Sequence, residues 1–394
     1  MQTNQAYIVS AVRTAVGRSK KGALRHERPE AMGAAVVRAA LERAGLDGAR
    51  VDDVLMGCAF PEGPQGMNIG RVIAQKAGLP DTVTGATLNR FCSSGLQTIA
   101  YASASIAAGH ADVIVAGGTE SMSMVPMSGF YFQPDPGVVA DDPELYVSMG
   151  VTAENIAAQW GIAREAQDAF ALQSHQRALA AIEFGRFKDE IVPLEVTDVG
   201  YDGGQRVEKT FVFDVDEGPR ADTSLEALAK LRPVFRAGGS VTAGNSSQTS
   251  DGAAATVLAS EQVVSDLGLT PLARVASFAL AGVAPEIMGV GPLEAIPKAI
   301  RRAGLRMEDI GLFELNEAFA AQSLAIVNDL GIDPSIVNVN GGAIALGHPL
   351  GCTGAKLTAT LLHEMKRRGV KYGVCTMCVG GGMGAAAVLE NLQV

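Results

Sequence analysis

The sequence predicts an α/β fold with two similar halves and a different region inserted between them. Strand-like apolar runs, such as residues 53–57 and 111–116, alternate with helix-like stretches toward both ends of the chain. This alternation is typical of largely buried sheets covered by helices. The chain has 394 residues, 47% of them hydrophobic. It is long enough for two or three compact domains, since a single core rarely exceeds about 250 residues.

The first half is predicted to alternate strands with helices rich in small residues. Its elements are, in order, a strand at residues 7–9, a helix at residues 30–44, a strand at residues 53–57, a helix at residues 93–108 and a strand that ends at Gly117 and Gly118.

The second half repeats this order. Ala-Gly-Leu occurs at residues 44–46 and again at residues 303–305, and an acidic pair and a strand follow each time. Such a repeat predicts two similar structural units. The elements expected in the second half are a strand at residues 311–315, helices at residues 316–330 and 353–368, and a strand at residues 372–378 that runs into three glycines.

Residues 121–247 do not fit the repeat and are predicted to form a loop domain. They contain a stretch rich in Met and aromatic residues, a helix at about residues 153–184 and a turn at residues 202–204 (DGG). The methionines either line a flexible pocket or fill irregular gaps in the core. The division predicted from this assigns residues 1–120 and about 248–270 to the first half, 121–247 to the loop domain and 271–394 to the second half.

Composition excludes several classes of protein. A net charge of −10 argues against a general nucleic-acid binder, which needs a basic face for phosphates. The sequence has no run of about 18 uninterrupted apolar residues, so we predict no membrane span. Residues 1–5 carry no feature of a secretory signal. Five scattered cysteines do not resemble a disulfide framework. We therefore expect a cytoplasmic protein.

Cys92 is the first candidate for chemistry. It lies between a strand-like segment and the helix predicted to start at about Ser93. A thiol at a helix N-terminus faces unpaired amide N–H groups and the positive end of the dipole, which favour the thiolate. The alternative is a buried cysteine that acts as a small hydrophobic residue.

His348 lies in a glycine-flanked turn, Gly347-His348-Pro349, in a chain with five histidines. It either acts as a base toward Cys92, if the two halves face each other, or is held by backbone carbonyls. Asn316, at the end of a predicted strand, is either a helix N-cap or a ligand for water. Residues 241–247 (VTAGNSS) predict only a loop.

Cys375 and Cys378 form a C-x-x-C pattern, but no second pair completes a zinc site, and we predict no metal. The pair ends a strand, whereas a redox pair of this kind normally opens a helix. Cys378 is the better candidate for a catalytic thiol. Gly380 and its neighbours also match a loose dinucleotide fingerprint, but too little chain follows for a βαβ unit, so we expect backbone amides that approach a substrate oxygen.

These segments together resemble the thiolase family over essentially the whole chain. The motifs that carry the resemblance are residues 89–97 (NRFCSSGLQ), 316–320 (NEAFA), 340–343 (NGGA) with 348–351 (HPLG), and 378–382 (CVGGG). The resemblance implies two βαβαβαββ-type halves in five alternating layers (αβαβα), with a loop domain inserted in the first half.

The resemblance also implies the roles of individual residues. Cys92 would be the acylated nucleophile, His348 its activator and a donor to one oxyanion hole, and Cys378 the general acid and base. Asn316 would hold a water in that hole, and the amides of Cys92 and Gly380 would form a second hole. Two further positions that match contacts to coenzyme A are Arg220 and Ser247.

The implied reaction is cleavage of a 3-ketoacyl-CoA by coenzyme A to acetyl-CoA and a shortened acyl-CoA. Coenzyme A is a co-substrate, and no tightly bound cofactor is expected. Family members are oligomers, so a homodimer or homotetramer is expected, with a β-oxidation complex as a further possible partner.

The sequence of the motifs is more similar to degradative enzymes. Biosynthetic acetoacetyl-CoA thiolases usually have His where this chain has Ser148, and the motif Asn-Arg-x-Cys-Ser-Ser-Gly-Leu-Gln around Cys92 and Met377 before Cys378 also resemble the degradative enzymes. Phe91 departs from the Gln often found at its position. The alternatives are a biosynthetic acetoacetyl-CoA thiolase, a ketoacyl synthase, which would need a second histidine in place of Cys378, and a non-catalytic acyl-CoA or lipid carrier.

Overall fold

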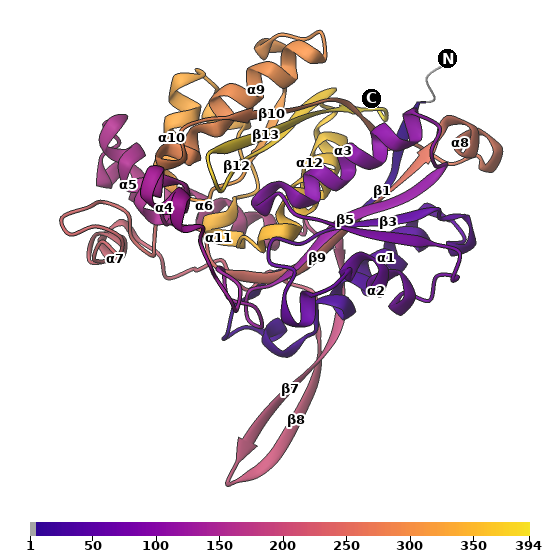
Figure 1. Ribbon diagram of the computed structural model, residues 1–394, viewed down its shortest axis with the longest axis horizontal. Coiled ribbons are helices and arrows are strands. Elements are labelled where there is room, and N and C mark those ends of the chain that lie inside the picture. Colours follow the sequence, from indigo (N-terminus) through magenta and orange to yellow (C-terminus); the bar gives the residue numbers. More distant parts are fainter. Residues whose placement is uncertain (1–4) are drawn as a thin grey trace.

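The computed structural model describes residues 5–394; residues 1–4, part of the segment considered for a signal, lie outside the described residues. The strands of the first half lie side by side (Figure 1), with β4 and β3, and β3 and β5, parallel and the remaining pairs antiparallel. Their order is β4 (Thr84–Leu88), β3 (Asp53–Gly57), β5 (Val113–Ser121), β9 (Ser250–Ser260) and β1 (Ala6–Thr14).

The second half has the same topology. Its parallel pair β11–β12 and its antiparallel pairs β12–β13 and β13–β10 match β3–β5, β5–β9 and β9–β1. A parallel bridge between Phe313 and Val337 stands where β4 lies beside β3. The two halves join through Ile8 of β1 and Ala273 of β10. The bounds are β11 (Leu312–Leu315), β12 (Tyr372–Val379), β13 (Met383–Asn391) and β10 (Ala273–Gly282).

Helices complete five layers, as the resemblance implied (Figure 1). Two helices cover the outer face of the first sheet, two lie between the sheets, and two cover the outer face of the second. They are α1 (Pro29–Ala44) with α2 (Ile69–Lys76), α3 (Ser94–Ala107) with α12 (Leu350–Arg368), and α9 (Gly291–Arg302) with α10 (Ala320–Asp329).

Glycines allow the central helices α3 and α12 to touch. A Cβ on Gly95 would lie 2.7 Å from the Ala355 nitrogen, and one on Gly354 would lie 2.2 Å from the Leu96 nitrogen. Any larger side chain would therefore separate the two backbones. The small residues that suggested helices in the sequence are what lets the two halves pack closely.

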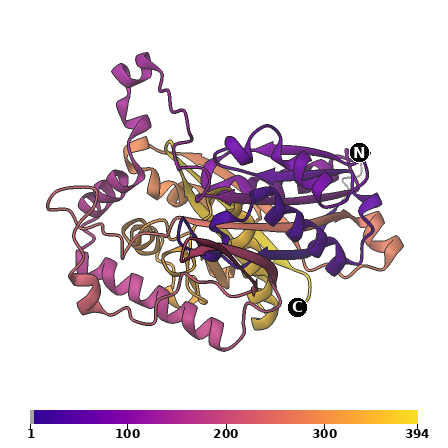
Figure 2. The same cartoon turned by 90° about the horizontal axis from the view of Figure 1, so that it is seen from below.

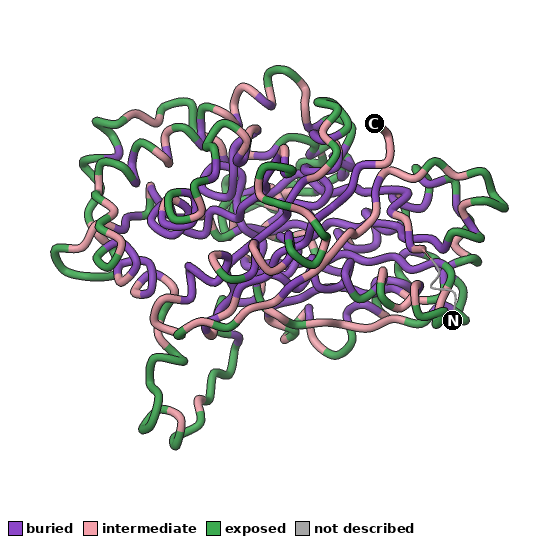
Figure 3. The backbone as a smooth tube through the Cα atoms, turned by 90° about the horizontal axis from the view of Figure 1, so that it is seen from above, coloured by how far each residue is buried: buried purple, intermediate pink, exposed green. Residues whose placement is uncertain are grey.

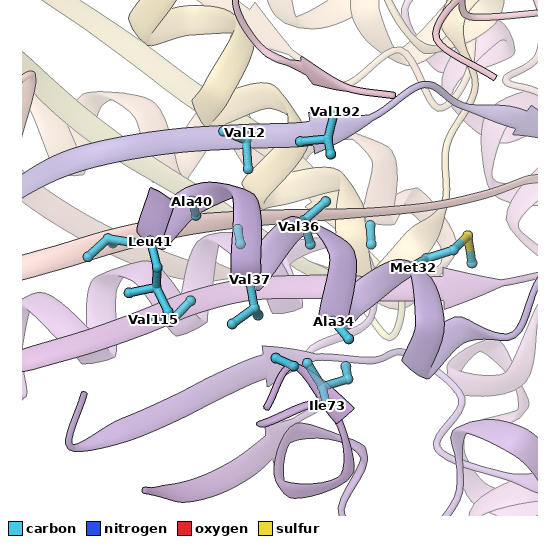
Figure 4. Packing of buried hydrophobic residues seen from close by; sticks show 14 of the residues in the cluster. Val12, Met32, Ala34, Val36, Val37, Ala40, Leu41, Ile73, Val115 and Val192 are labelled. Atoms are coloured by element: carbon cyan, nitrogen blue, oxygen red, sulfur yellow. The ribbon is translucent and has the colours of Figure 1, made fainter. Parts of the chain in front are cut away.

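Each outer layer packs through apolar side chains. Val36, Val37 and Leu41 of α1 belong to one buried cluster with Val12 of β1 and Val115 of β5 (Figure 4). The strands are buried on both faces, which is why they read as continuous apolar runs rather than as alternating ones. Figure 3 shows the buried residues concentrated along the strands and the central helices.

The chain between β5 and β9 leaves this layered body. The segment around α4 extends outward (Figure 2) and is largely exposed, and the hairpin β7–β8 projects from the bottom of the view in Figure 1. The elements are α4 (Pro136–Asp141), α5 (Met149–Gln159), α6 (Arg164–Glu183), β6 (Ile191–Val192), β7 (Leu194–Asp202), β8 (Gln205–Phe213) and α7 (Leu225–Ala229). Three short elements elsewhere are β2 (Gly17–Arg18), α8 (Glu261–Leu267) and α11 (Ala343–Leu346).

The structure corrects three predicted boundaries. The helix expected at residues 153–184 is two helices, interrupted at Gly161, whose φ of 63° ends α5. The strand expected to end at Gly118 continues to Ser121. The helix expected from Asn316 begins at Ala320. Among residues 5–394, no helix is both long and apolar enough to cross a membrane.

Candidate active site

Cys92 lies in a short 3₁₀ turn, residues 91–93, directly before α3. The preceding Phe91 has a φ of 43°, which a side-chain-bearing residue adopts only when its surroundings hold it there. The Asn89 Oδ1 accepts the Phe91 N–H at 2.8 Å, and the Ser94 hydroxyl donates to the Phe91 carbonyl at 2.6 Å. These hydrogen bonds fix the backbone that carries Cys92.

The Cys92 thiol is buried, with 8% of the residue exposed. Burial raises the pKa of the thiol to about 12, while hydrogen bonds from the backbone amides of Cys92 and Gly380 act in the opposite direction. The amide at the helix terminus thus lowers the pKa of the thiol, as expected, but desolvation has the larger effect. A thiolate at this position requires a group that removes the proton.

Cys378 and Gly380 reach Cys92 from the second half. Cys378 lies near the end of β12, fully buried, and burial together with the neighbouring Cys92 raises the pKa of its thiol. The glycines form the turn of the β12–β13 hairpin, with φ of 79° at Gly381 and 81° at Gly382. The dinucleotide fingerprint is thus a hairpin and not a strand–turn–helix unit. Cys375 is free and faces the Gly354 carbonyl at 3.8 Å, inside the core.

His348 is held at both ring nitrogens. The Thr353 hydroxyl donates to the Pro349 carbonyl at 2.9 Å, so its oxygen accepts from the His348 Nδ1–H at 2.5 Å. This hydrogen bonding assigns the proton to Nδ1 and leaves Nε2 as an acceptor. The Asn316 Nδ2 lies 3.3 Å from that Nε2. Burial, with a smaller effect from Lys356, lowers the pKa of His348 to about 3, which keeps the ring neutral.

Asn316 is not a helix N-cap. Phe319 directly precedes α10, and the Asn316 amide N–H donates to the Thr376 carbonyl of β12 at 3.0 Å. Its Oδ1 is buried and has no hydrogen-bond partner among the described residues. A buried polar oxygen without a protein partner is suited to contact with a water or a ligand.

The turn of Cys92 lies against both α12 and β12, so the two halves meet at the candidate site. Glycines allow this approach: a Cβ on Gly118 would lie 2.0 Å from the Gly351 carbonyl oxygen, and one on Gly57 would lie 2.7 Å from the same oxygen. In the part of the chain that the structure describes, no hydrogen bond joins the Cys92 thiol to the His348 ring.

Arg220 lines a pocket of about 310 Å³ beside this site. Its side chain is 60% exposed and pairs with Asp222 at 3.4 Å. The pocket also includes Arg18, His175 and Gln248. The Gln248 carbonyl accepts the His348 N–H at 3.0 Å, so the pocket reaches the residue that anchors the histidine turn.

Ser247 lies beside the pocket rather than among its lining residues. Its N–H donates to the Ala318 carbonyl at 2.9 Å. Two bridges flank this contact, Ser246 with Phe319 and Thr249 with His348. The segment that includes residues 241–247, for which the sequence predicted only a loop, thus contacts both the turn of Asn316 and the turn of His348.

The sequence interpretation missed Thr353. Its place in the first turn of α12, five residues after His348, is a signal that the two side chains can meet.

Comparisons with known proteins agree with this architecture. The family models "Thiolase, N-terminal domain" and "Thiolase, C-terminal domain" match residues 6–262 and 269–391. The 3-ketoacyl-CoA thiolase of Bacillus subtilis is 56% identical over 98% of this chain and 99% of that protein. The acetyl-CoA acetyltransferase of Pseudomonas aeruginosa is 49% identical over 98% of both.

A solved structure shows the same fold. The crystal structure of the Bacillus anthracis acetyl-CoA acetyltransferase superposes with a TM-score of 0.88 and 44% identity, covering 99% of this chain and all of that one. Both family models, the near-complete coverage of the relatives and the shared fold lead to one conclusion: this chain belongs to the thiolase family.

Proposed function

We propose that the protein is a degradative 3-ketoacyl-CoA thiolase that works through an acyl group on Cys92. The observation that carries this proposal is the neutral, buried His348, whose unprotonated Nε2 lies 3.3 Å from the Asn316 Nδ2. A thiol with a raised pKa and a base held without its proton suit a nucleophile that is activated only during the reaction.

The steps assign a role to each side chain. His348 Nε2 takes the Cys92 proton, and the thiolate attacks the ketone carbon of the 3-ketoacyl-CoA. The C–C bond breaks, Cys378 gives its proton to the leaving acetyl-CoA enolate, and the shortened acyl group stays on Cys92. Coenzyme A loses its thiol proton to Cys378 and attacks the thioester, and Cys92 leaves as the thiolate and recovers its proton from His348. No metal or redox partner enters this balance.

Two oxyanion sites support these steps. The amides of Cys92 and Gly380 bond to the Cys92 sulfur and would bind the oxygen of the acyl thioester. The protonated His348 Nε2 and a water on Asn316 would bind the other oxygen, and the unpartnered Asn316 Oδ1 fits that water.

The loop domain, residues 121–247, is proposed to bind coenzyme A as a co-substrate rather than as a resident cofactor. Arg220 offers a cation in the lining of the pocket, and Ser247 directly precedes Gln248 of that lining. With this division, residues 1–120 and about 248–270 form the first half and 271–394 the second. We propose a cytoplasmic homodimer or homotetramer that acts in fatty-acid β-oxidation, alone or with a multienzyme partner.

The degradative assignment rests on Ser148 and on the sequence motifs around Cys92 and Cys378. Ser148 directly precedes α5, whose first residue, Met149, packs against the core cluster of Cys378. Phe91 and Met149 flank Gly380, at 3.5 and 3.8 Å from the position of a Cβ. The 56% identity to a 3-ketoacyl-CoA thiolase supports the same assignment. A biosynthetic acetoacetyl-CoA thiolase that runs the condensation is the second candidate, since several relatives are acetyl-CoA acetyltransferases.

A series of 3-ketoacyl-CoA substrates tests the function. We expect acetyl-CoA and a shortened acyl-CoA from each, with kcat/KM higher for longer chains than for acetoacetyl-CoA, because Phe91 and Met149 add apolar contact worth about 0.8 kcal/mol for each buried methylene. The measurement is thioester loss with product identification by mass. A clear preference for acetoacetyl-CoA would favour the biosynthetic enzyme, and no acetyl-CoA from any substrate would exclude both.

The pH profile tests the base. The pKa of His348 is lowered to about 3 by burial, so the ring stays neutral, and able to accept a proton, well below the ordinary histidine value of about 6.5. The acid limb of kcat/KM should therefore lie below a pH of about 5 rather than near 6.5. Its measurement uses buffers of constant ionic strength, with enzyme stability checked at each pH. A fall centred near 6.5 would contradict the assignment.

A further inference from the structure

We propose that Glu120 is a positioning residue that holds the turn of Cys92 and the turn of His348 in the arrangement that catalysis requires. The proposal rests on the roles proposed above for those two residues. It concerns a carboxylate that touches neither residue directly but accepts hydrogen bonds from the backbone of Ala59, which contacts Asn89 before Cys92, and of Gly351, which follows His348.

Glu120 lies at the end of β5, between the two halves, with 1% of the residue exposed. Its Oε2 accepts two backbone N–H groups at 2.7 Å, from Ala59 of the first half and Gly351 of the second. Its Oε1 accepts from the Gln65 side chain at 2.7 Å and from the Phe60 N–H at 3.4 Å. One oxygen atom therefore connects both halves.

The first route leads from Glu120 to Cys92. Glu120 fixes the Ala59 peptide, whose carbonyl accepts the Asn89 Nδ2–H at 2.9 Å. The Oδ1 of the same Asn89 accepts the N–H of Phe91 at 2.8 Å. Phe91 holds the unusual φ of 43° that places the following Cys92. A displaced Ala59 would release the support of this strained residue.

The second route leads to His348. Gly351 lies in the first turn of α12, where Thr353 accepts the proton on His348 Nδ1. A carboxylate at this helix N-terminus satisfies an otherwise unpaired N–H and interacts favourably with the helix dipole. A Cβ on Gly351 would lie 2.7 Å from Glu120 Oε2 and 2.6 Å from the Cα of Cys58, so the two backbones and the carboxylate are in close contact.

Every contact made by the Glu120 carboxylate is with a donor, and the Cys58 thiol at 3.7 Å adds a weak one. A glutamine has the same size but replaces one acceptor by an NH₂ group. The NH₂ group would face N–H donors that lie at hydrogen-bond distance from the carboxylate. At least one of these buried donors would then lose its acceptor. We therefore expect Glu120→Gln to displace the backbone that donates to Glu120, in addition to removing its charge.

The test compares Glu120→Gln with Glu364→Gln in the full-length enzyme. Glu364 is a buried carboxylate near the opposite end of α12, where it pairs with Arg367 and accepts from Asn340. We expect Glu120→Gln to lower kcat for thiolysis about 10²-fold with KM for coenzyme A changed less than about threefold, because a displacement of about 1 Å in reacting groups has an effect of that size. Glu364→Gln should lower the unfolding temperature and leave kcat unchanged.

A third variant keeps the proposal testable if Glu120→Gln does not fold. Asn89 is exposed, and Asn89→Ala breaks the route between Ala59 and Phe91 while Glu120 stays in place. We expect kcat to fall about tenfold or more, with a near-native unfolding temperature. Wild-type kcat in either folded variant, or an equal loss of kcat in Glu364→Gln, would overturn the proposal. Failure of the wild-type enzyme to form an acyl adduct would instead contradict the proposed function.

Discussion

Cys92→Ala should lose the covalent acyl intermediate and at least about 10⁴-fold of the thiolysis rate, because a two-step reaction through a thioester is no longer available. The wild-type enzyme incubated with acetyl-CoA should gain the mass of one acetyl group per chain, and peptide mapping should place it on Cys92. The mutated side chain is a methyl group at the end of a turn whose hydrogen bonds involve Asn89, Phe91 and Ser94. We therefore expect the variant to fold.

Cys375→Ala is the matched control for this experiment. Cys375 is buried in the same region, on β12, but its sulfur faces the Gly354 carbonyl in the core rather than Cys92. This variant should retain the acetyl adduct. An adduct at the wild-type level in Cys92→Ala, or its loss only in Cys375→Ala, would show that Cys92 is not the nucleophile.

Arg13→Met should destabilise the fold by about 3–5 kcal/mol, the range seen when one partner of a buried ion pair is removed. Arg13 is 1% exposed and pairs with two acids of the inserted region, Glu190 at 2.5 Å and Asp216 at 2.7 Å. Its guanidinium also lies over the ring of Phe187, 4.9 Å from the centroid. Because methionine fills the space without the charge, both carboxylates would stay buried without their cation.

Denaturant unfolding at fixed protein concentration measures this change, with Arg306→Met as the control. Arg306 is 78% exposed and its ion pair with Glu308 has a distance of 3.9 Å, so its loss should cost less than about 0.5 kcal/mol. Equal effects of the two substitutions would show that the Arg13 cluster does not join the inserted region to the first half.

The repeat was the strongest information about the fold in the sequence. Two Ala-Gly-Leu helix ends, each followed by an acidic pair and a strand, predict two similar halves, and β3 and β11 occupy matching places in the two sheets. Helix ends inside the insert were harder to place. Gly161 separates α5 from α6 by adopting a left-handed conformation, and a glycine within a helical pattern does not by itself reveal that choice.

The sequence by itself determined the fold class and the family, and it supplied the candidate site residues. The tertiary structure decided the pKa values and the hydrogen-bond partners of those residues. Burial, which sums over neighbours from both halves, raises the pKa of Cys92 and lowers that of His348. It also decided that Asn316 faces His348 instead of capping a helix, and that Glu120 links two turns more than 200 residues apart, as its bonds to Ala59 and Gly351 show. Local sequence patterns do not predict these pKa values and contacts, because desolvation and long-range hydrogen bonds arise only when distant segments pack together.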